Sequence, residues 1–173
     1  MSDLPASSPP TDRRLTVNAA FLKDIKDDNR DLKILIDRMK LLTNPREAAA
    51  NHWRELIQLF SDLRDQLALH FGLEEAYGYF DLAIESDAQL SVCANTLRSQ
   101  HAVLFEEARH LAEAAADACT GDEPIEGVTP EVTTAQEKVL VRFDGFLAQF
   151  NDHEEAELKL ILDALDNDLG VGD

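Results

Sequence analysis

The chain of 173 residues is long enough for one domain with a substantial hydrophobic core, without disulfides or other covalent support. Its 34 acidic residues against 16 basic ones give a formal charge of -18 at pH 7, so its surface repels nucleic-acid phosphates and anionic lipid headgroups. The composition therefore argues against nucleic acid and membranes as partners.

Residues 1–14 are rich in Ser and Pro and poor in apolar side chains. Such a segment buries too little apolar surface to offset the entropy of ordering, so we expect a flexible N-terminal tail. It lacks the basic start and apolar run of an export signal, and no stretch of the chain approaches a membrane span. Cys93 and Cys119 fall in one predicted helix, about 39 Å apart, and cannot pair within it. We therefore expect a reduced, cytoplasmic setting.

The first predicted helix begins near Asn18, in a domain that we expect to span residues 15–168. Its apolar residues recur at three- and four-residue steps, which is typical of one face of an amphipathic helix. They are Phe21, Leu22, Ile25, Leu32, Leu35, Ile36 and Met39. The helix should end at Thr43, because Asn44 and Pro45 suit the cap and first turn of the next helix.

The second predicted helix runs from Pro45 into the eighties, and Gly72 and Gly78 weaken its last turns. The next break is expected at residues 85–87, where a Ser and an Asp can cap a third helix. That third helix should continue toward Cys119.

A loop is expected at residues 120–128, where two glycines and a proline interrupt the periodicity. Thr129 and Pro130 should open the fourth helix, and residues 169–173 should form a second tail. The residues that this helix should bury are Val139, Phe143, Phe146, Leu147, Phe150, Glu154, Leu158, Ile161, Leu162 and Leu165. Because alternation at period two is absent, we predict an all-α, up-down-up-down antiparallel four-helix bundle.

Polar residues interrupt the apolar helix faces at matching heights. His70 and Glu74 are four apart, so their side chains leave one helix face a turn apart. His70 lies about fifteen residues before the predicted turn and His101 about fifteen after it, so an antiparallel hairpin brings their imidazoles to one level. Glu154 and Asn29 fall near that level. Buried imidazoles and carboxylates are costly unless paired or bound to metal, and these donors suit iron, manganese or zinc.

At these residues the chain resembles the hemerythrin-like family of cation-binding four-helix bundles, which carry a non-haem di-iron site. The family's His-Phe-x-x-Glu-Glu motif is present at residues 70–75. The resemblance implies that His70 is a terminal ligand and that Glu74 is a bridging carboxylate. The family's third-helix His matches His101.

Two positions depart from the family pattern. The fourth helix repeats the second motif and keeps Glu154, but Phe150 stands in place of its His. In the first helix, Asn29 stands where a His is expected, and a neutral amide oxygen is a poor substitute for imidazole on iron. The resemblance thus implies a depleted iron site. Its implied ligands are His70, Glu74, His101 and Glu154.

His153 offers a partial replacement. It lies three residues beyond Phe150 and begins its own four-residue pair with Glu157, which allows a shifted site. The alternative is that His153 lies at a helix boundary among solvated acids. His110 lies about 180° round its helix from His101 and should face away from the site.

Two functions remain open. In the first, the chain binds one metal ion, iron or similar, for sensing, storage or weak binding of a small ligand. In the second, it is a metal-free bundle that acts as a scaffold or protein-interaction module, because Phe150 and Asn29 lower the cost of an empty core. Di-iron catalysis is disfavoured, since the motifs run His first and Glu four later, unlike the Glu-x-x-His of carboxylate-rich di-iron proteins. We therefore expect no enzymatic activity.

Overall fold

The computed structural model describes residues 29–119 and 131–170, and every regular element within these ranges is a helix. An N-terminal helix occupies residues 29–43. The elements that follow are α2 (Arg46–Ala49), the 3-10 turn η1 (Ala50–His52), α3 (Trp53–Ala76), α4 (Asp81–Ser86), α5 (Ala88–Asp117) and α6 (Thr134–Gly170). The predicted all-α class is confirmed.

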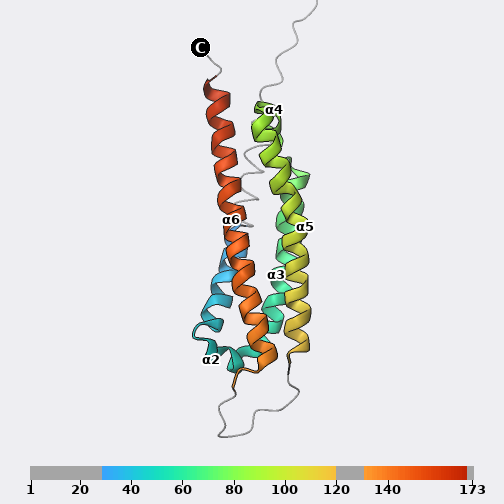
Figure 1. Cartoon of the computed structure of the whole chain (residues 1–173), viewed down its shortest axis with the longest axis vertical. Coiled ribbons are helices and arrows are strands. Elements are labelled where there is room, and N and C mark those ends of the chain that lie inside the picture. The colour runs from blue at the N-terminus through green and yellow to red at the C-terminus, as the bar shows by residue number, and fades with distance from the viewer. Residues whose placement is uncertain (1–28, 120–130, 171–173) are drawn as a thin grey trace, which may run out of the picture.

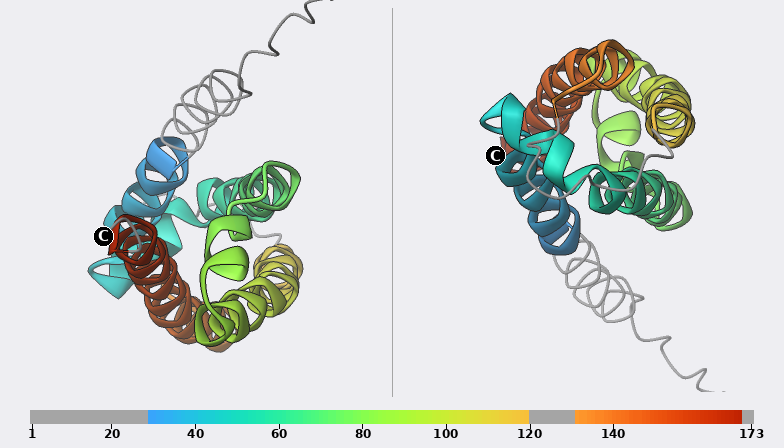
Figure 2. Two further views of the ribbon diagram at one scale, coloured as in Figure 1. Left: turned by 90° about the horizontal axis from the view of Figure 1, so that it is seen from above. Right: turned by 90° about the horizontal axis from the view of Figure 1, so that it is seen from below.

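The long helices pack side by side as an antiparallel bundle. α5 packs against both α3 and α6, and the N-terminal helix lies beside the lower half of α6 (Figure 1). Seen end-on, these helices form a ring, and the short α4 lies within it at one end (Figure 2), where it contacts α5 and α6. The predicted four-helix bundle is confirmed. Among the described helices, none combines the length and the apolar character needed to cross a bilayer.

The buried residues follow alternating three- and four-residue steps along each long helix, the pattern of a coiled-coil seam. On α6 these residues are Val139, Phe143, Phe146, Phe150, His153, Glu157, Leu160 and Ala164. Most of the apolar ones form a large hydrophobic cluster toward α2, and a smaller cluster surrounds Phe80 of α4. A layer of buried polar residues separates the two clusters.

Part of the predicted core of the fourth helix is not buried. Leu158, Leu162 and Leu165 are 59%, 53% and 44% exposed. These three residues lie on a stripe of α6 to one side of its buried seam. Their assignment to the core, made from the apolar pattern of the sequence, was wrong.

The second predicted helix is interrupted rather than continuous to the eighties. α3 ends at Ala76, and Gly78 adopts a φ of 67°, a left-handed conformation that is accessible to glycine and costly for other residues. The helix therefore breaks there, and the chain restarts as α4 at Asp81. At the start of α2, Pro45 is the N-cap, one residue later than predicted.

Helix capping explains the other boundaries. The predicted break at residues 85–87 is confirmed, because Asp87 caps α5 by accepting hydrogen bonds from two backbone N–H groups. α6 begins later than expected, because Thr133 and Gln136 form a reciprocal capping box. α6 continues to Gly170, two residues into the expected tail. Residues 1–28, 120–130 and 171–173 lie outside the described residues, and so do the predicted N-terminal tail, first-helix start and loop.

We expect Asp87→Ala to lower the free energy of unfolding by about 1 kcal/mol, because two N–H groups at the start of α5 lose their acceptor. Thermal unfolding followed by circular dichroism should show a melting temperature about 3 °C lower. Gln89→Ala is the matched control, since only the backbone of Gln89 takes part in the cap. Equal melting temperatures for the two variants would show that the cap contributes nothing.

Candidate metal centre

Three histidine and two glutamate side chains are buried in the polar layer between the two hydrophobic clusters. α3 contributes His70 and Glu74, α5 contributes His101, and α6 contributes His153 and Glu157. Each is no more than 3% exposed. The helix seams explain this convergence, because every one of these residues occupies a position of the three-and-four repeat that faces the bundle axis.

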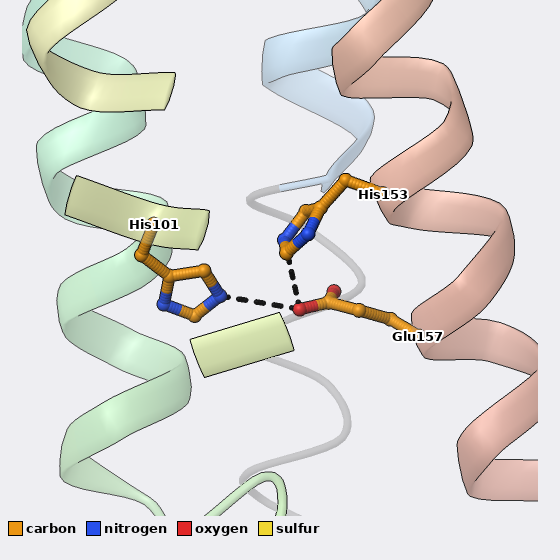
Figure 3. A group of neighbouring side chains, drawn as sticks. All are labelled: His101, His153 and Glu157. Carbon is orange, nitrogen blue, oxygen red and sulfur yellow. Dashed lines mark hydrogen bonds and ion pairs between the residues drawn. The ribbon is translucent and has the colours of Figure 1, made fainter. Parts of the chain in front are cut away.

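The tightest group consists of His101, His153 and Glu157. Nε2 of His101 lies 3.2 Å from Oε1 of Glu157, and Nε2 of His153 lies 3.0 Å from the same oxygen. Figure 3 shows both imidazoles, one from each of two neighbouring helices, directed at this oxygen. One ligand atom from each residue falls within 4.8 Å of the others, which is the spacing of donors around a single cation.

The far side of each imidazole is occupied by an acceptor. Nδ1 of His153 lies 3.0 Å from the amide oxygen of Gln100, and Nδ1 of His101 lies 3.4 Å from Oε1 of Glu75. An amide oxygen and a carboxylate accept hydrogen bonds, so in the tautomer in which Nδ1–H donates to these outer partners, Nε2 keeps its lone pair. Metal-binding histidines are held in the same way by outer partners.

The donor atoms therefore fit a metal ion. In this tautomer two lone pairs and a carboxylate oxygen point at one another, an arrangement that needs a cation or a proton between them. His153 Nε2 is buried, and despite its 3.0 Å approach to Glu157 it makes no hydrogen bond of acceptable geometry. Such a nitrogen is available for coordination.

A second, looser group adjoins the first. Nε2 of His70 lies 3.4 Å from Oε1 of Glu74 and 3.2 Å from Oε1 of Glu154. The other oxygen of Glu74, Oε2, lies 3.5 Å from Nε2 of His101. Glu74 thus connects the two groups, whereas the Glu154 side chain, 33% exposed, lies at the edge of the layer.

Aromatic rings enclose the tight group. Phe71 stacks on His101 with ring centroids 4.2 Å apart, and Phe80 packs on the same imidazole at 5.7 Å. Phe71 also meets His153 edge-on at 5.9 Å. These rings limit water at the layer, which strengthens every electrostatic interaction within it.

The electrostatics of the layer favour the charged form of Glu157. Burial acts to raise the pKa of Glu157, but contacts with the imidazoles of His101 and His153 outweigh it and hold that pKa below its ordinary value. Burial raises the pKa of the Tyr79 phenol strongly, and the negative charges of Glu157 and nearby glutamates add to the effect. Tyr79 therefore stays protonated beside the layer.

Asn29 and Phe150, the two residues that depart from the expected ligand pattern, lie together on the side of the looser group. Asn29 and Phe150 line one cavity of about 270 Å³ that also reaches Glu154. The Asn29 Oδ1 atom is buried without a hydrogen-bond partner, while the Phe150 ring packs 6.3 Å from the His70 ring. Among the described residues, this side of the layer therefore has one imidazole and no replacement for the others.

The predicted residues His70, Glu74 and His101 do converge, with Glu154 in contact at the margin. The structure adds His153 and Glu157 and favours the shifted site over a solvated helix boundary, because both residues are 2% exposed. The signal was their spacing, which equals that of His70 and Glu74. Away from the layer, Arg109 and Arg142 contact the His110 ring.

Comparison with protein families supports this geometry. The chain matches the family model described as Hemerythrin HHE cation binding domain over residues 20–167. No curated protein and no solved structure matches the chain significantly. The family match spans most of the chain and includes every buried histidine and glutamate of the polar layer. The chain therefore belongs to the hemerythrin HHE cation-binding domain family.

Proposed function

We propose that this chain binds one ion of iron or a similar first-row metal through His101, His153, Glu157 and Glu74. The observation that supports the proposal is the convergence of two imidazole Nε2 atoms on one buried carboxylate oxygen, while acceptors occupy both Nδ1 atoms. Mixed nitrogen and carboxylate donors suit iron, manganese and zinc. A bound iron ion would supply a Lewis-acidic, redox-active centre.

The protein residues have distinct roles in this proposal. Gln100 and Glu75 fix the tautomer and orientation of the two imidazoles. Phe71 and Phe80 exclude water from the layer. Glu157 and Glu74 supply the negative charge that offsets the charge of a cation. These roles concern holding an ion, so we propose metal sensing or storage, or weak binding of a small ligand, and no enzymatic activity.

The looser group should hold a second ion much more weakly. It has a single imidazole, His70, and the other candidate donors are Glu154 and the neutral amide of Asn29. Fewer nitrogen donors and a carboxylate that is one-third exposed lower affinity and allow exchange with water. We therefore do not expect reversible ligand carriage of the kind that depends on two equivalent iron ions.

A metal-free interaction module is the second candidate. It is favoured by the fact that His70 lies within 3.5 Å of two carboxylates and His101 within 3.5 Å of three. Hydrogen bonds from the imidazoles would then satisfy the buried carboxylates in place of a metal ion. The two candidates differ in metal content, which can be measured directly.

We expect protein purified from iron-supplemented cells to contain about one metal ion per chain, and Glu74→Ala to reduce this to near zero. Glu74 is 1% exposed and is the carboxylate that contacts imidazoles of both groups. Elemental analysis of the purified proteins measures the content, and circular dichroism verifies that the variant remains helical.

Glu75→Ala is the matched control. Glu75 is the next residue and is half-exposed, and it contacts only the outer nitrogen of His101, so we expect its loss to weaken metal affinity about tenfold and leave most of the metal in place. Wild-type protein that contains no metal and takes none up on titration would establish the metal-free candidate.

A further inference from the structure

A cavity of about 360 Å³ lies between α5 and α6 and reaches the polar layer. We call it the α5–α6 cavity. Its inner wall includes His153, which is 2% exposed, and the half-buried Gln100. The other lining residues are Leu97, Val103, Leu104, Gln149, Asp152 and Ala156. On each helix they recur at three- and four-residue steps, so two facing stripes form the walls. The cavity therefore connects solvent with one imidazole of the tight group.

The size and lining of the α5–α6 cavity suit a hydrated cation. Six waters occupy roughly 180 Å³, at about 30 Å³ each in the liquid, so a divalent cation with its inner shell of water fits the space of about 360 Å³. Asp152 and Gln149 are exposed and offer a carboxylate and an amide oxygen, and Gln100 lies deeper. An ion that enters can thus exchange water for protein oxygen before it meets the imidazole.

Charge distinguishes this cavity from two others at the margin of the layer. The cavity at Asn29 is lined by two lysines beside its acids, and a further cavity, at Glu75, is lined by Arg98. The described lining of the α5–α6 cavity includes the carboxylate of Asp152 and no Lys or Arg. Basic side chains repel an approaching cation and a carboxylate attracts it, so the α5–α6 cavity offers the most favourable approach of the three.

The position of His153 also favours this side. Phe71 meets the imidazole edge-on, and its Nε2 faces Glu157 (Figure 3). The remaining nitrogen, Nδ1, lies 3.0 Å from the amide oxygen of Gln100, and both residues line the cavity. The Gln100 amide is therefore the polar contact that holds the cavity side of this imidazole.

We propose that the α5–α6 cavity is the entrance through which a divalent cation reaches the tight group, with Gln100 as its latch. The inference rests on the proposed metal binding. Asp152 attracts the hydrated ion to the cavity. The Gln100 amide turns aside and releases Nδ1, so that the His153 imidazole can turn toward the cavity and back toward Glu157. Gln100 is thus a positioning residue that acts through His153.

Blocking the cavity should slow metal exchange without changing affinity. Ala156 is exposed, lines the cavity and supplies no donor atom. We expect Ala156→Phe to slow both uptake and release of cobalt(II) by at least about tenfold, with an unchanged dissociation constant, because an obstacle on the route alters neither end state. Ala148→Phe is the matched control, at an exposed position of α6 outside the lining. Stopped-flow absorption follows uptake by metal-free protein, and excess EDTA measures release.

The attraction of the ion can be tested separately from steric blocking. Asp152→Asn should slow cobalt(II) uptake about threefold at low ionic strength, and the difference should vanish at high salt. Asp37→Asn is the matched control, because Asp37 lines the cavity at Asn29. Slower uptake for Asp37→Asn, with Asp152→Asn unchanged, would overturn the proposal and identify the cavity at Asn29 as the entrance.

The latch should affect uptake as well as release. Gln100→Ala should speed uptake about fivefold and release about fiftyfold, which weakens affinity about tenfold. Glu75→Ala removes the equivalent outer partner of His101, and it should speed release alone. If Gln100→Ala also speeds release alone, Gln100 only orients the imidazole and the latch is overturned.

The outcomes separate the entrance from the proposed function. Wild-type protein that takes up no cobalt(II) would overturn the metal site and its entrance together. Protein that binds cobalt(II), with the same rates in Ala156→Phe, Asp152→Asn and the wild type, would overturn the entrance and leave the metal site standing. Circular dichroism establishes that each variant is folded, and Asp152→Asn tests the entrance if the bulkier Ala156→Phe does not fold.

Discussion

Glu157→Gln should weaken metal binding by about a hundredfold or more, whereas Glu154→Gln should weaken it by about tenfold or less. Glu157 is 2% exposed, and one of its oxygens contacts two imidazoles. Glu154 is one-third exposed and contacts only His70. Gln keeps the size and helix propensity of Glu and removes the charge, so the comparison isolates the carboxylate. Titration against a chromophoric chelator measures the affinities.

The same pair of variants distinguishes two possible positions of the metal-binding carboxylate on the fourth helix, Glu154 and Glu157. The sequence repeat aligns Glu154 with Glu74, while the structure places Glu157 at the centre of the layer. A larger effect for Glu154→Gln would show that the metal ion binds at the His70 group instead. Circular dichroism of both variants establishes that a loss of binding is not a loss of fold.

Removal of metal should lower the melting temperature of the wild-type protein by about 10 °C. An ion present at about a thousand times its dissociation constant stabilises the folded state by about 4 kcal/mol, and each kcal/mol corresponds to a few degrees in a domain of this size. The reason is local: Glu74 and Glu157 are both about 2% exposed or less in one layer, and their charges repel when no cation lies between them. Scanning calorimetry before and after exhaustive chelation measures the change.

The Glu74→Ala variant is the control for chelation, because a chain that contains almost no metal should melt at nearly the same temperature with and without chelator. A wild-type melting temperature that chelation leaves unchanged, with full helicity, would contradict the proposed metal role and support the metal-free interaction module.

The helical architecture could be predicted because the relevant signals are local. On α5, Ala94, Leu97, His101, Leu104 and Ala108 repeat at steps of three and four, and all are buried. The cap at Asp87 follows from a short polar side chain that can accept from the next turn. The break after Ala76 was missed, because Gly78 reads as a weak helix residue until its left-handed conformation is seen.

The candidate site was only partly predictable from the sequence. His70, Glu74 and His101 were found from a motif and from equal distances to a turn. On the fourth helix, the Leu-Ala and Glu-Glu-Ala flanks suggested that Phe150 and Glu154 form the second motif. The seven-residue repeat of buried positions instead predicts that His153 and Glu157 face the core. His153 lies seven residues after the buried Phe146, and Glu157 lies seven after the buried Phe150. Contacts across helices, such as Gln100 with His153, depend on helix rotation and could not be read from one sequence.

The polar layer divides the apolar interior into two bodies of unequal size, with Phe80, Ala83, Leu160 and Ala164 in the smaller one. Cooperativity along the bundle must pass through imidazoles and carboxylates instead of close-packed hydrocarbon. We therefore expect the α4 end to open as a separate cooperative unit whose coupling to the rest depends on the ionic state of the layer. If the layer binds a cation as we propose, loss of that cation should loosen this end first.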